Sequence, residues 1–260
     1  MKAFLYASAL FYLSGFIAVL AFHFKSVRAL EPTSKALVLL GLLSHTTALI
    51  LRITATGHAP MASMFETLLF YSWTTVLVTV IVMLKYSERK AEVVTMPVAI
   101  LALLFAIVNE KPGGPLSLIL RTYWFEAHVT LSFAAYALFT LAFSGAALYL
   151  FYESGGKNGT EVKRYQDIAG RSVLWGFCLF SAAMFSGALW AYLAWGTYWL
   201  WEPKTIWSFI VWFYYAGAMH AYYVKDWRGR GLSIATVGGF FVVIFTYLGV
   251  SLLMKSSHNF

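Results

Sequence analysis

Charged residues are scarce in this chain. Asp, Glu, Lys and Arg make up 12% of its 260 residues, about half of the share that soluble domains carry. Hydrophobic residues make up 60%, and the mean hydropathy is +0.71. A surface this poor in charge does not suit contact with water on all sides. The composition therefore excludes an ordinary soluble domain and predicts a polytopic membrane protein, with the lipid bilayer as its surroundings.

Cysteine is almost absent as well. The single cysteine, Cys178, lies inside an apolar segment, and one thiol excludes an internal disulfide or a CxxC redox pair. The net charge is +8, but the basic residues are scattered over short connections and form no continuous face. No nucleic-acid partner is therefore expected.

The sequence instead contains several long apolar segments. A membrane-spanning helix needs about 20 apolar residues, and backbone groups in lipid must be satisfied within the segment. The sequence thus predicts an all-α fold, a polytopic membrane helical bundle of about eight transmembrane helices in a single domain over residues 1–260. The expected spans are residues 3–22, 35–51, 66–84, 93–108, 126–152, 171–193, 205–224 and 232–254. The first is too long for a signal peptide and is read as a retained helix. The fourth is the weakest, because it is short and begins at Pro97 after a charged patch.

The basic residues predict the orientation. Thirteen Lys and Arg residues fall in connections one, three, five and seven, and six fall on the opposite side. Because the cytoplasmic side carries the excess of Lys and Arg, both termini are expected to be extracytoplasmic. This orientation depends on the fourth segment crossing the membrane. Connection five, residues 153–167, is Gly-rich and charged and is predicted to be a soluble cytoplasmic linker.

One stretch stands out within this pattern. Six of the ten tryptophans lie in residues 190–212, with one acid, Glu202, and one base, Lys204, on either side of Pro203. An apolar helix precedes the stretch and another follows it, so it is predicted to be an outer turn between two helices. Tryptophans also gather in interfacial belts, but a belt spreads over many helix ends. Six in one connection favour a platform for a large planar ligand.

Two histidines are expected on the same side as this stretch. His128 lies at the outer start of the fifth span, and His258 lies just beyond the outer end of the eighth. Two imidazoles beside an aromatic platform could supply the axial ligands of a haem iron, although an interfacial histidine is often only a solvated loop residue. Arg52, Arg121 and Lys204 share the outer face and could pair with carboxylates of a ligand.

His220 is predicted to lie much deeper. It follows Lys204 by 16 residues, which is about 24 Å along a helix, in the cytoplasmic half of the membrane. His45 is expected near mid-membrane and His23 at the inner end of the first span. A second, inner site using His220 and another imidazole is geometrically possible, and so is a packing role for His220.

The tryptophan-rich stretch resembles a known family signature. Residues 195–204, WGTYWLWEPK, are similar to the WGxxWxWDPKE signature of haem-handling cytochrome c assembly proteins, above all the CcsA (ResC) branch of system II. Residues 57–66 resemble the family's outer segment between its second and third helices, and residues 227–230 resemble its seventh connection. The likeness covers nearly the whole chain, and the signature is long and compositionally unusual.

The resemblance implies a function. Members of the family carry haem across the bacterial cytoplasmic (inner) membrane, with a CcsB-like partner, and present it for attachment to the CxxCH motif of an apocytochrome c. This chain would then be a subunit of a holocytochrome c synthase, and no catalytic residue is assigned to it. By resemblance, His128 and His258 would be the axial ligands of an outer haem b, and His220 would ligate an inner haem in transit. The tryptophan loop would hold the face and edge of the haem, and together with the outer basic residues this gives the predicted set Trp195, Trp199, Trp201, Glu202, Lys204, Arg52 and Arg121.

The sequence also departs from the family pattern. Glu202 replaces the aspartate of the signature, Thr205 replaces the following glutamate, and Met64 stands where the outer segment usually has asparagine. In the family the second inner ligand belongs to CcsB, and no motif supports His45 or His23 as a substitute. A HemX-like regulatory protein that binds haem without attaching it is therefore an alternative. A membrane cytochrome b ranks last, because only His45 and His220 could form an intramembrane pair.

Overall fold

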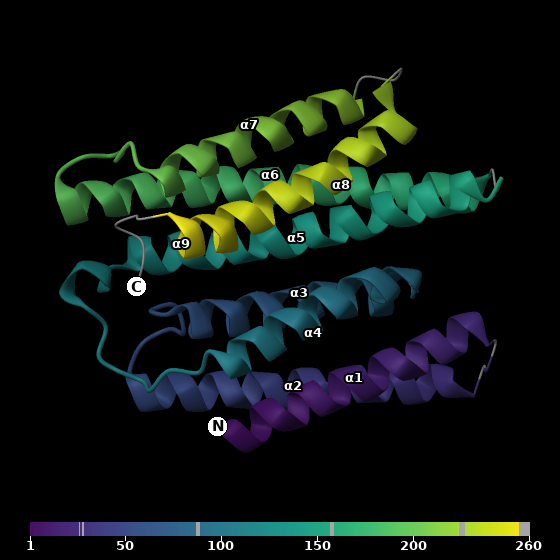
Figure 1. The fold of residues 1–260 in the computed structure, drawn as a ribbon, viewed down its shortest axis with the longest axis horizontal. Coiled ribbons are helices and arrows are strands. Elements are labelled where there is room, and N and C mark those ends of the chain that lie inside the picture. The colour runs from purple at the N-terminus through teal and green to yellow at the C-terminus, as the bar shows by residue number, and fades with distance from the viewer. Residues whose placement is uncertain (26, 28, 87–88, 157–158, 224–226, 255–260) are drawn as a thin grey trace. The chain divides into compact units, whose positions relative to one another are not determined.

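The computed structural model describes residues 1–25, 27, 29–86, 89–156, 159–223 and 227–254. These residues form helices joined by turns, with no strand among them, which confirms the predicted all-α fold. The chain divides into two compact units, Met1–Leu118 and Ile119–Phe260, called unit 1 and unit 2 below. Within each unit taken by itself, Figure 1 shows successive helices running in alternating directions.

Unit 1 is a four-helix bundle. Its helices are α1 (Lys2–Phe24), α2 (Leu30–Thr56), α3 (Met64–Tyr86) and α4 (Lys90–Val108). Each helix packs on the next in the chain, and α4 returns to pack on α1. Short connections between successive antiparallel helices produce this up-and-down arrangement. A 3₁₀ turn, η1 (Leu118–Leu120), follows before the next long helix.

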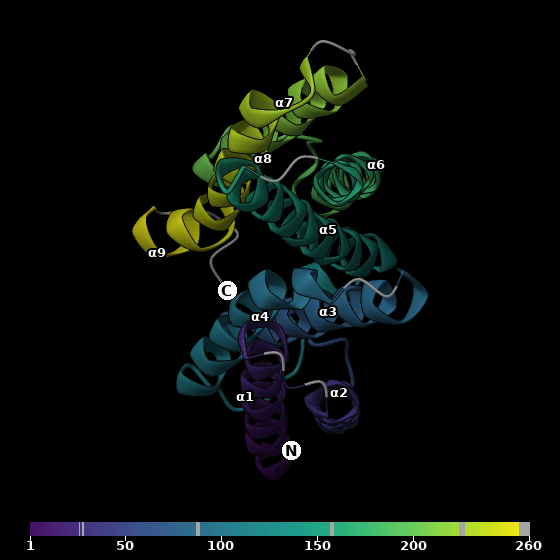
Figure 2. The same ribbon diagram turned by 90° about the vertical axis from the view of Figure 1, so that its right-hand side faces the viewer.

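Unit 2 repeats this arrangement, and its first two helices are longer than any in unit 1. The helices of unit 2 are α5 (Tyr123–Ser154), α6 (Thr160–Trp195), α7 (Pro203–Tyr223) and α8 (Arg230–Ile244), which continues through a π-helical turn, η3 (Phe245–Gly249), into α9 (Val250–Leu253). Here α8 closes the ring by packing on α5. Figure 2 shows α6 nearly end-on with α5 beside it. These two approach closely at Gly145 of α5, where an added Cβ would lie 2.8 Å from the Tyr165 carbonyl oxygen of α6.

The helices match the predicted spans. Each of the eight apolar segments forms a helix. Within the part of the chain that the structure describes, seven helical runs are long and apolar enough to cross a membrane: α1 to α6 and the run Arg230–Leu253. The remaining helix, α7, has 21 residues, and its tyrosines, tryptophans and lysine make it less apolar. The chain is therefore a multi-pass membrane protein, and its orientation stays a prediction.

The expectation that the fourth span is the weakest is wrong. α4 begins at Lys90, so Pro97 lies inside the helix, and α4 has the highest hydropathy of the seven runs. The charged patch before Pro97 is part of the helix because Glu92 is buried, 1% exposed, in an ion pair with Arg89.

The linker predicted at residues 153–167 is also shorter than expected, because α6 begins at Thr160. Val162 and Tyr165 are buried, and the Tyr165 ring stacks on Tyr152 of α5 with 5.4 Å between centroids. The charged side chain of Lys163 is exposed on the other side of the helix. The first turns of α6 are thus amphipathic, with an apolar stripe that packs on α5 and charged residues on the opposite face. The charged residues made this part of the helix resemble a soluble linker.

Candidate functional site

The tryptophan-rich stretch forms the tight turn between α6 and α7. Gly196 ends α6 in the left-handed conformation, with φ of 72°, and its N–H donates to the Tyr192 carbonyl oxygen over 2.9 Å. A glycine is favoured there because it has no Cβ to clash. Pro203 opens α7, where its missing N–H costs no helical hydrogen bond. The non-helical turn is therefore only residues 196–202.

Aromatic rings pack on both sides of this turn. Trp195 lies 4.8 Å from Trp190 between ring centroids, while Trp199 and Trp201 lie 4.8 and 5.9 Å from Phe209 of α7. Trp201 is nevertheless 77% exposed. We call Trp195, Trp199 and Trp201 the indole platform. The rings of Trp190 and Phe209 support the platform, and Trp201 leaves exposed surface on which a flat apolar ligand can lie.

His128 projects from the second turn of α5 towards α6. Its Nδ1 lies 2.8 Å from the Ala183 carbonyl oxygen of α6. A carbonyl oxygen can only accept, so Nδ1 carries the hydrogen and donates. The neutral imidazole then has its lone pair on Nε2, and a backbone acceptor at Nδ1 is the usual support for a metal-binding histidine.

Two residues of α6 hold the imidazole in place. The Trp190 ring lies nearly parallel to it, at 17° with 6.4 Å between centroids. Trp190 is itself 1% exposed, and its Nε1 donates to the Ile119 carbonyl oxygen over 2.8 Å. At Gly187 an added Cβ would lie 2.5 Å from the His128 Nδ1. Since Trp190 also contacts Trp195, the structure brings His128 to one edge of the indole platform.

The last helix of unit 2 is tied to the same end. Lys204 Nζ donates to Ser251 Oγ of α9 over 3.0 Å, and Ser251 Oγ donates to the Tyr247 carbonyl oxygen over 2.7 Å. Figure 1 shows the start of α5, the α6–α7 turn and α9 together at one end of the unit. His258 lies outside the described residues. It is seven residues beyond Ser251, a stretch that reaches at most about 25 Å when extended.

The other predicted outer residues differ in their surroundings. Glu202 is partly buried, and its carbonyl oxygen accepts from the Ile206 N–H over 3.0 Å. Arg121 is exposed immediately before α5. Arg52 belongs to unit 1, where its Nε donates to Glu66 Oε1 over 2.8 Å and both side chains are buried. Arg52 is thus engaged by Glu66, and its role at a haem edge stays a prediction.

His220 lies in the last turn of α7, at the opposite end of that helix from Lys204, and its side chain is exposed. It is thus far from the indole platform, as its spacing predicts. Within the described residues of unit 2, the structure does not bring a second histidine to it.

Three groups at the site were not predicted: the Gly187 cradle, the Ala183 carbonyl oxygen and Trp190 as the support of the imidazole. One signal was present in the sequence. A glycine inside a long helix, three residues before a tryptophan, is a candidate for close approach by a neighbouring helix. Its partner could not be read from the sequence.

Comparison with known proteins agrees with this architecture. The sequence matches the family described as Cytochrome C assembly protein over residues 61–258. It is 30% identical to the cytochrome c biogenesis protein CcsA of Prochlorococcus marinus (strain NATL1A), over 94% of this chain and 90% of that protein. It is also 30% identical to CcsA of strain MIT 9515, over 82% of this chain and 78% of that protein.

A solved structure, the cytochrome c heme lyase CcmF, superposes on 98% of this chain with a TM-score of 0.67. The match covers 46% of the CcmF chain at 18% identity, so this chain spans about half of that protein and the likeness concerns the fold alone. The family match extends over more than half of the sequence, and the CcsA relatives align over most of their length. The chain therefore belongs to the cytochrome c assembly protein family.

Proposed function

We propose that this chain binds haem b at the α6–α7 turn and presents it outside the bacterial cytoplasmic membrane for covalent attachment to an apocytochrome c with a CxxCH motif. A CcsB-like membrane protein would complete the machinery. The observation that carries the proposal is His128, whose Nδ1 is engaged by the Ala183 carbonyl oxygen. Its Nε2 is thereby prepared to ligate iron at the edge of the indole platform.

The surroundings of His128 suit a porphyrin. The open surface of Trp201 offers an apolar face, and Lys204 and Arg121 offer positive charge for the propionates. His258 is the proposed second axial ligand, and the bond between Lys204 and Ser251 keeps the start of its segment near the platform. Haem itself supplies vinyl groups, to which the cysteine thiols add across the double bond. This chain's part is to hold and orient the ring, which lowers the entropic cost of that addition.

His220 is proposed to serve a different step. Its imidazole is exposed at the other end of α7, and a polar group at such a position in a membrane needs a partner. Ligation of haem in transit, with the second ligand from a CcsB-like protein, would provide one. This assignment depends on the predicted topology.

A HemX-like regulatory protein is the second candidate, because Glu202 and Thr205 depart from the family signature. Such a protein would bind haem at the same site without delivering it. Co-expression with a CcsB-like protein and a CxxCH apocytochrome separates the two functions. Covalent holocytochrome should form if the chain is an assembly factor, whereas its absence while haem remains bound favours the regulatory function.

The first test is the haem content of the purified chain. His128→Ala and His258→Ala should each remove most of the bound haem, whereas His58→Ala, a change in unit 1, should leave it unchanged. Added imidazole should restore haem to His128→Gly, since a free ligand can occupy the vacated position. Wild-type haem content in both His128→Ala and His258→Ala would refute the outer site.

A further inference from the structure

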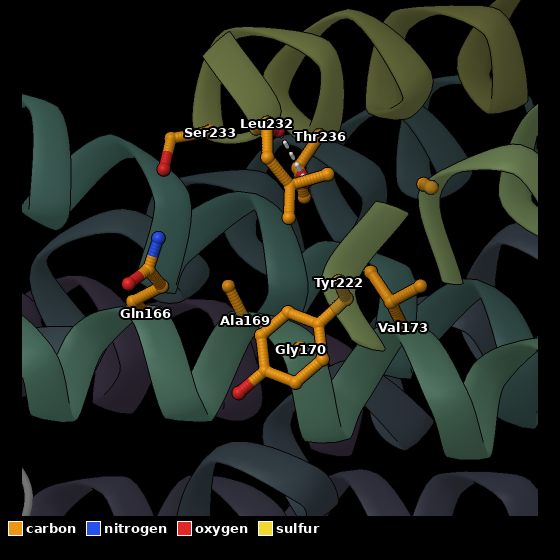
Figure 3. Close-up of a pocket in the computed structure, with 9 residues that line it drawn as sticks. Gln166, Ala169, Gly170, Val173, Tyr222, Leu232, Ser233 and Thr236 are labelled. Carbon is orange, nitrogen blue, oxygen red and sulfur yellow. Dashed lines mark hydrogen bonds between the residues drawn. The ribbon is translucent and has the colours of Figure 1, made fainter. Parts of the chain in front are cut away.

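A small pocket lies at the other end of unit 2, between α6, α7 and α8 (Figure 3). Its polar lining consists of Gln166, Tyr222, Ser233 and Thr236, and the rest is apolar. The volume is about 10 Å³, and the pocket is partly open to the surface. That volume is roughly what one water-sized group requires. The pocket can therefore admit one oxygen atom of a larger ligand whose remainder stays at the rim.

The pocket contains a donor that lacks an acceptor. Gln166 Nε2 is buried and has no hydrogen-bond partner among the described residues. In Figure 3 this nitrogen points towards the Ser233 side of the pocket. A buried N–H without an acceptor is costly, by a few kcal/mol. Together with the Ser233 hydroxyl, it makes the pocket suited to an oxygen that accepts hydrogen bonds.

The rim is positively charged. Lys163 is exposed one turn before Gln166 on α6, and Arg230 is exposed one turn before Ser233 on α8. Ser233 lies in the first turn of α8, a helix of 15 residues, where the helix dipole is positive. Arg230 also lies 3.6 Å from Glu153 Oε2. Glu153 offsets part of the charge of Arg230, and Asp167 adds a second carboxylate beside the pocket, so the three cations Lys163, Arg230 and Arg228 leave the rim with a small excess of positive charge.

The wall beside Gln166 is rigid. Tyr222 lies so close over Gly170 that an added Cβ there would overlap its ring. The Tyr222 hydroxyl donates to Asp167 Oδ1 over 2.9 Å. On the other side, Arg228 lies 4.6 Å from the centre of the Tyr222 ring, and its Nε donates to the Tyr222 carbonyl oxygen over 2.7 Å. The pocket is thus fixed in shape, with a third cation beside it.

We propose that this pocket binds one non-bridging oxygen of the phosphate group of an anionic phospholipid, whose remaining oxygens meet Lys163 and Arg230. The shape argues for a phosphate carried by a larger molecule, because the pocket takes one oxygen and leaves the rest of the group at the membrane surface. The predicted topology puts this end at the cytoplasmic leaflet, where anionic lipids attract clustered Lys and Arg. A free phosphate ion shares the chemistry but lacks the lipid anchor.

Native mass spectrometry of the purified chain in detergent tests the proposal, with phosphatidylglycerol, phosphatidylcholine or inorganic phosphate as the probe. Wild type should retain phosphatidylglycerol in preference to phosphatidylcholine. Gln166→Leu should weaken that retention by about tenfold, since a hydrogen bond to a charged group is lost. Lys163→Gln should weaken it by about fivefold. Lys85→Gln, which removes an exposed lysine at the end of α3 in unit 1, should change nothing.

Three results would overturn the proposal. Equal retention of the two lipids would show that the pocket has no preference for an anionic headgroup. Saturation by millimolar inorganic phosphate that displaces the lipid would identify a free-anion site. Unchanged retention in both Gln166→Leu and Lys163→Gln, each with a wild-type circular dichroism spectrum, would indicate that the pocket holds only water. None of these readouts involves haem, so they are independent of the function proposed above.

Discussion

In unit 1, two buried ion pairs lie near opposite ends of the bundle, whereas no charged side chain is buried among the described residues of unit 2. Arg89 uses three nitrogens: it donates to both carboxylate oxygens of Glu92, to the Glu31 carbonyl oxygen and to Ser34. It therefore joins α4 to α2. Between the ends, the Tyr12 hydroxyl lies 3.4 Å from His45 Nδ1, and both residues are fully buried.

Arg52 and Glu66 form the second pair and join α2 to α3. Glu66 Oε1 accepts from Arg52, and Oε2 accepts from the Ala62 N–H over 2.8 Å. When two packed helices each carry one partner of a buried ion pair, few alternative helix registers are stable, because a shifted register would leave a buried charge unpaired. The Arg52–Glu66 pair thus specifies how α2 and α3 align.

Unit 2 is instead held by stacked rings. Phe139 stacks on Tyr215 with 3.6 Å between centroids, and Phe143 stacks on Phe240 at 4.4 Å. Aromatic pairs contribute large buried areas without desolvating a charge. The comparison indicates a division of labour: unit 1 has the features of a scaffold, and unit 2 offers the rigid apolar surroundings that a planar ligand requires.

The largest effect is expected from breaking an ion pair of unit 1. Arg52→Ala leaves the Glu66 carboxylate buried without its partner and should lower the free energy of unfolding by about 3–5 kcal/mol. Arg52→Met/Glu66→Leu removes both charges and should lose much less. Denaturant titration in detergent measures both changes, and Lys85→Ala, an exposed lysine of unit 1, is the control.

The double variant also tests whether Arg52 has a second role. If the pair is purely structural, Arg52→Met/Glu66→Leu should retain haem in amounts similar to wild type. A stable double variant without haem would show that Arg52 serves the ligand, as its expected place on the outer face predicts. The assignment of unit 1 as a scaffold would then be wrong at this position.

The next effect is expected in unit 2, at Gly187. In Gly187→Ala the new methyl group would lie 2.5 Å from the His128 Nδ1, so the ring must move and its bond to Ala183 must break. Overpacking of this kind costs about 1–3 kcal/mol. The expected results are weaker haem binding and loss of the split α and β bands of low-spin iron in the absorption spectrum of the reduced protein.

Gly217→Ala is the matched control for this change. It adds the same methyl group to a helix of the same unit, where nothing lies within 4 Å of the new Cβ. It should leave the spectrum and the haem content unchanged. Equal haem loss in both variants would mean that the effect comes from unit 2 as a whole and not from the position of His128.

Span length and apolarity were enough to predict most of the fold. The segment predicted at residues 66–84 is the helix Met64–Tyr86, because an apolar run of that length has no other stable form in lipid. The start of α6 was missed since Thr160 opens an amphipathic turn in a charged stretch. There the buried face is set by packing on α5, through contacts such as that of Tyr165 with Tyr152.

The site was predictable only in part. The composition identified the indole platform. The position of His128 at the start of the fifth span predicted that it lies at a similar depth in the membrane. The contact between α5 and α6 decides which nitrogen of His128 is engaged, and although Gly187 is a candidate for close approach, the sequence does not show that His128 is its partner or that Ala183 is the acceptor. Similarly, Arg52 and Glu66 could be assigned to one end of the bundle, but their pairing depends on how α2 packs against α3.

The smallest effect is expected from a pair of matched changes, one in each unit. Trp73 Nε1 donates to Thr46 Oγ1 in unit 1, and Trp212 Nε1 donates to Ser181 Oγ in unit 2, both over 2.9 Å. Each bond joins two helices through uncharged, partly buried groups. Trp73→Phe and Trp212→Phe should therefore each lower the free energy of unfolding by about 0.6 kcal/mol.

Equal losses of unfolding free energy in Trp73→Phe and Trp212→Phe would mean that uncharged hydrogen bonds stabilise the two units equally. The units would then differ only in their buried charged groups. Thr46→Val and Ser181→Ala remove the acceptors and should reproduce the losses, which separates the hydrogen bond from the packing of the indole. A much larger loss for Trp73→Phe than for Trp212→Phe would show that unit 1 depends on uncharged hydrogen bonds as well. Unit 1 would then be stabilised by polar contacts in general, of which the two ion pairs are only one part, and unit 2 by aromatic packing.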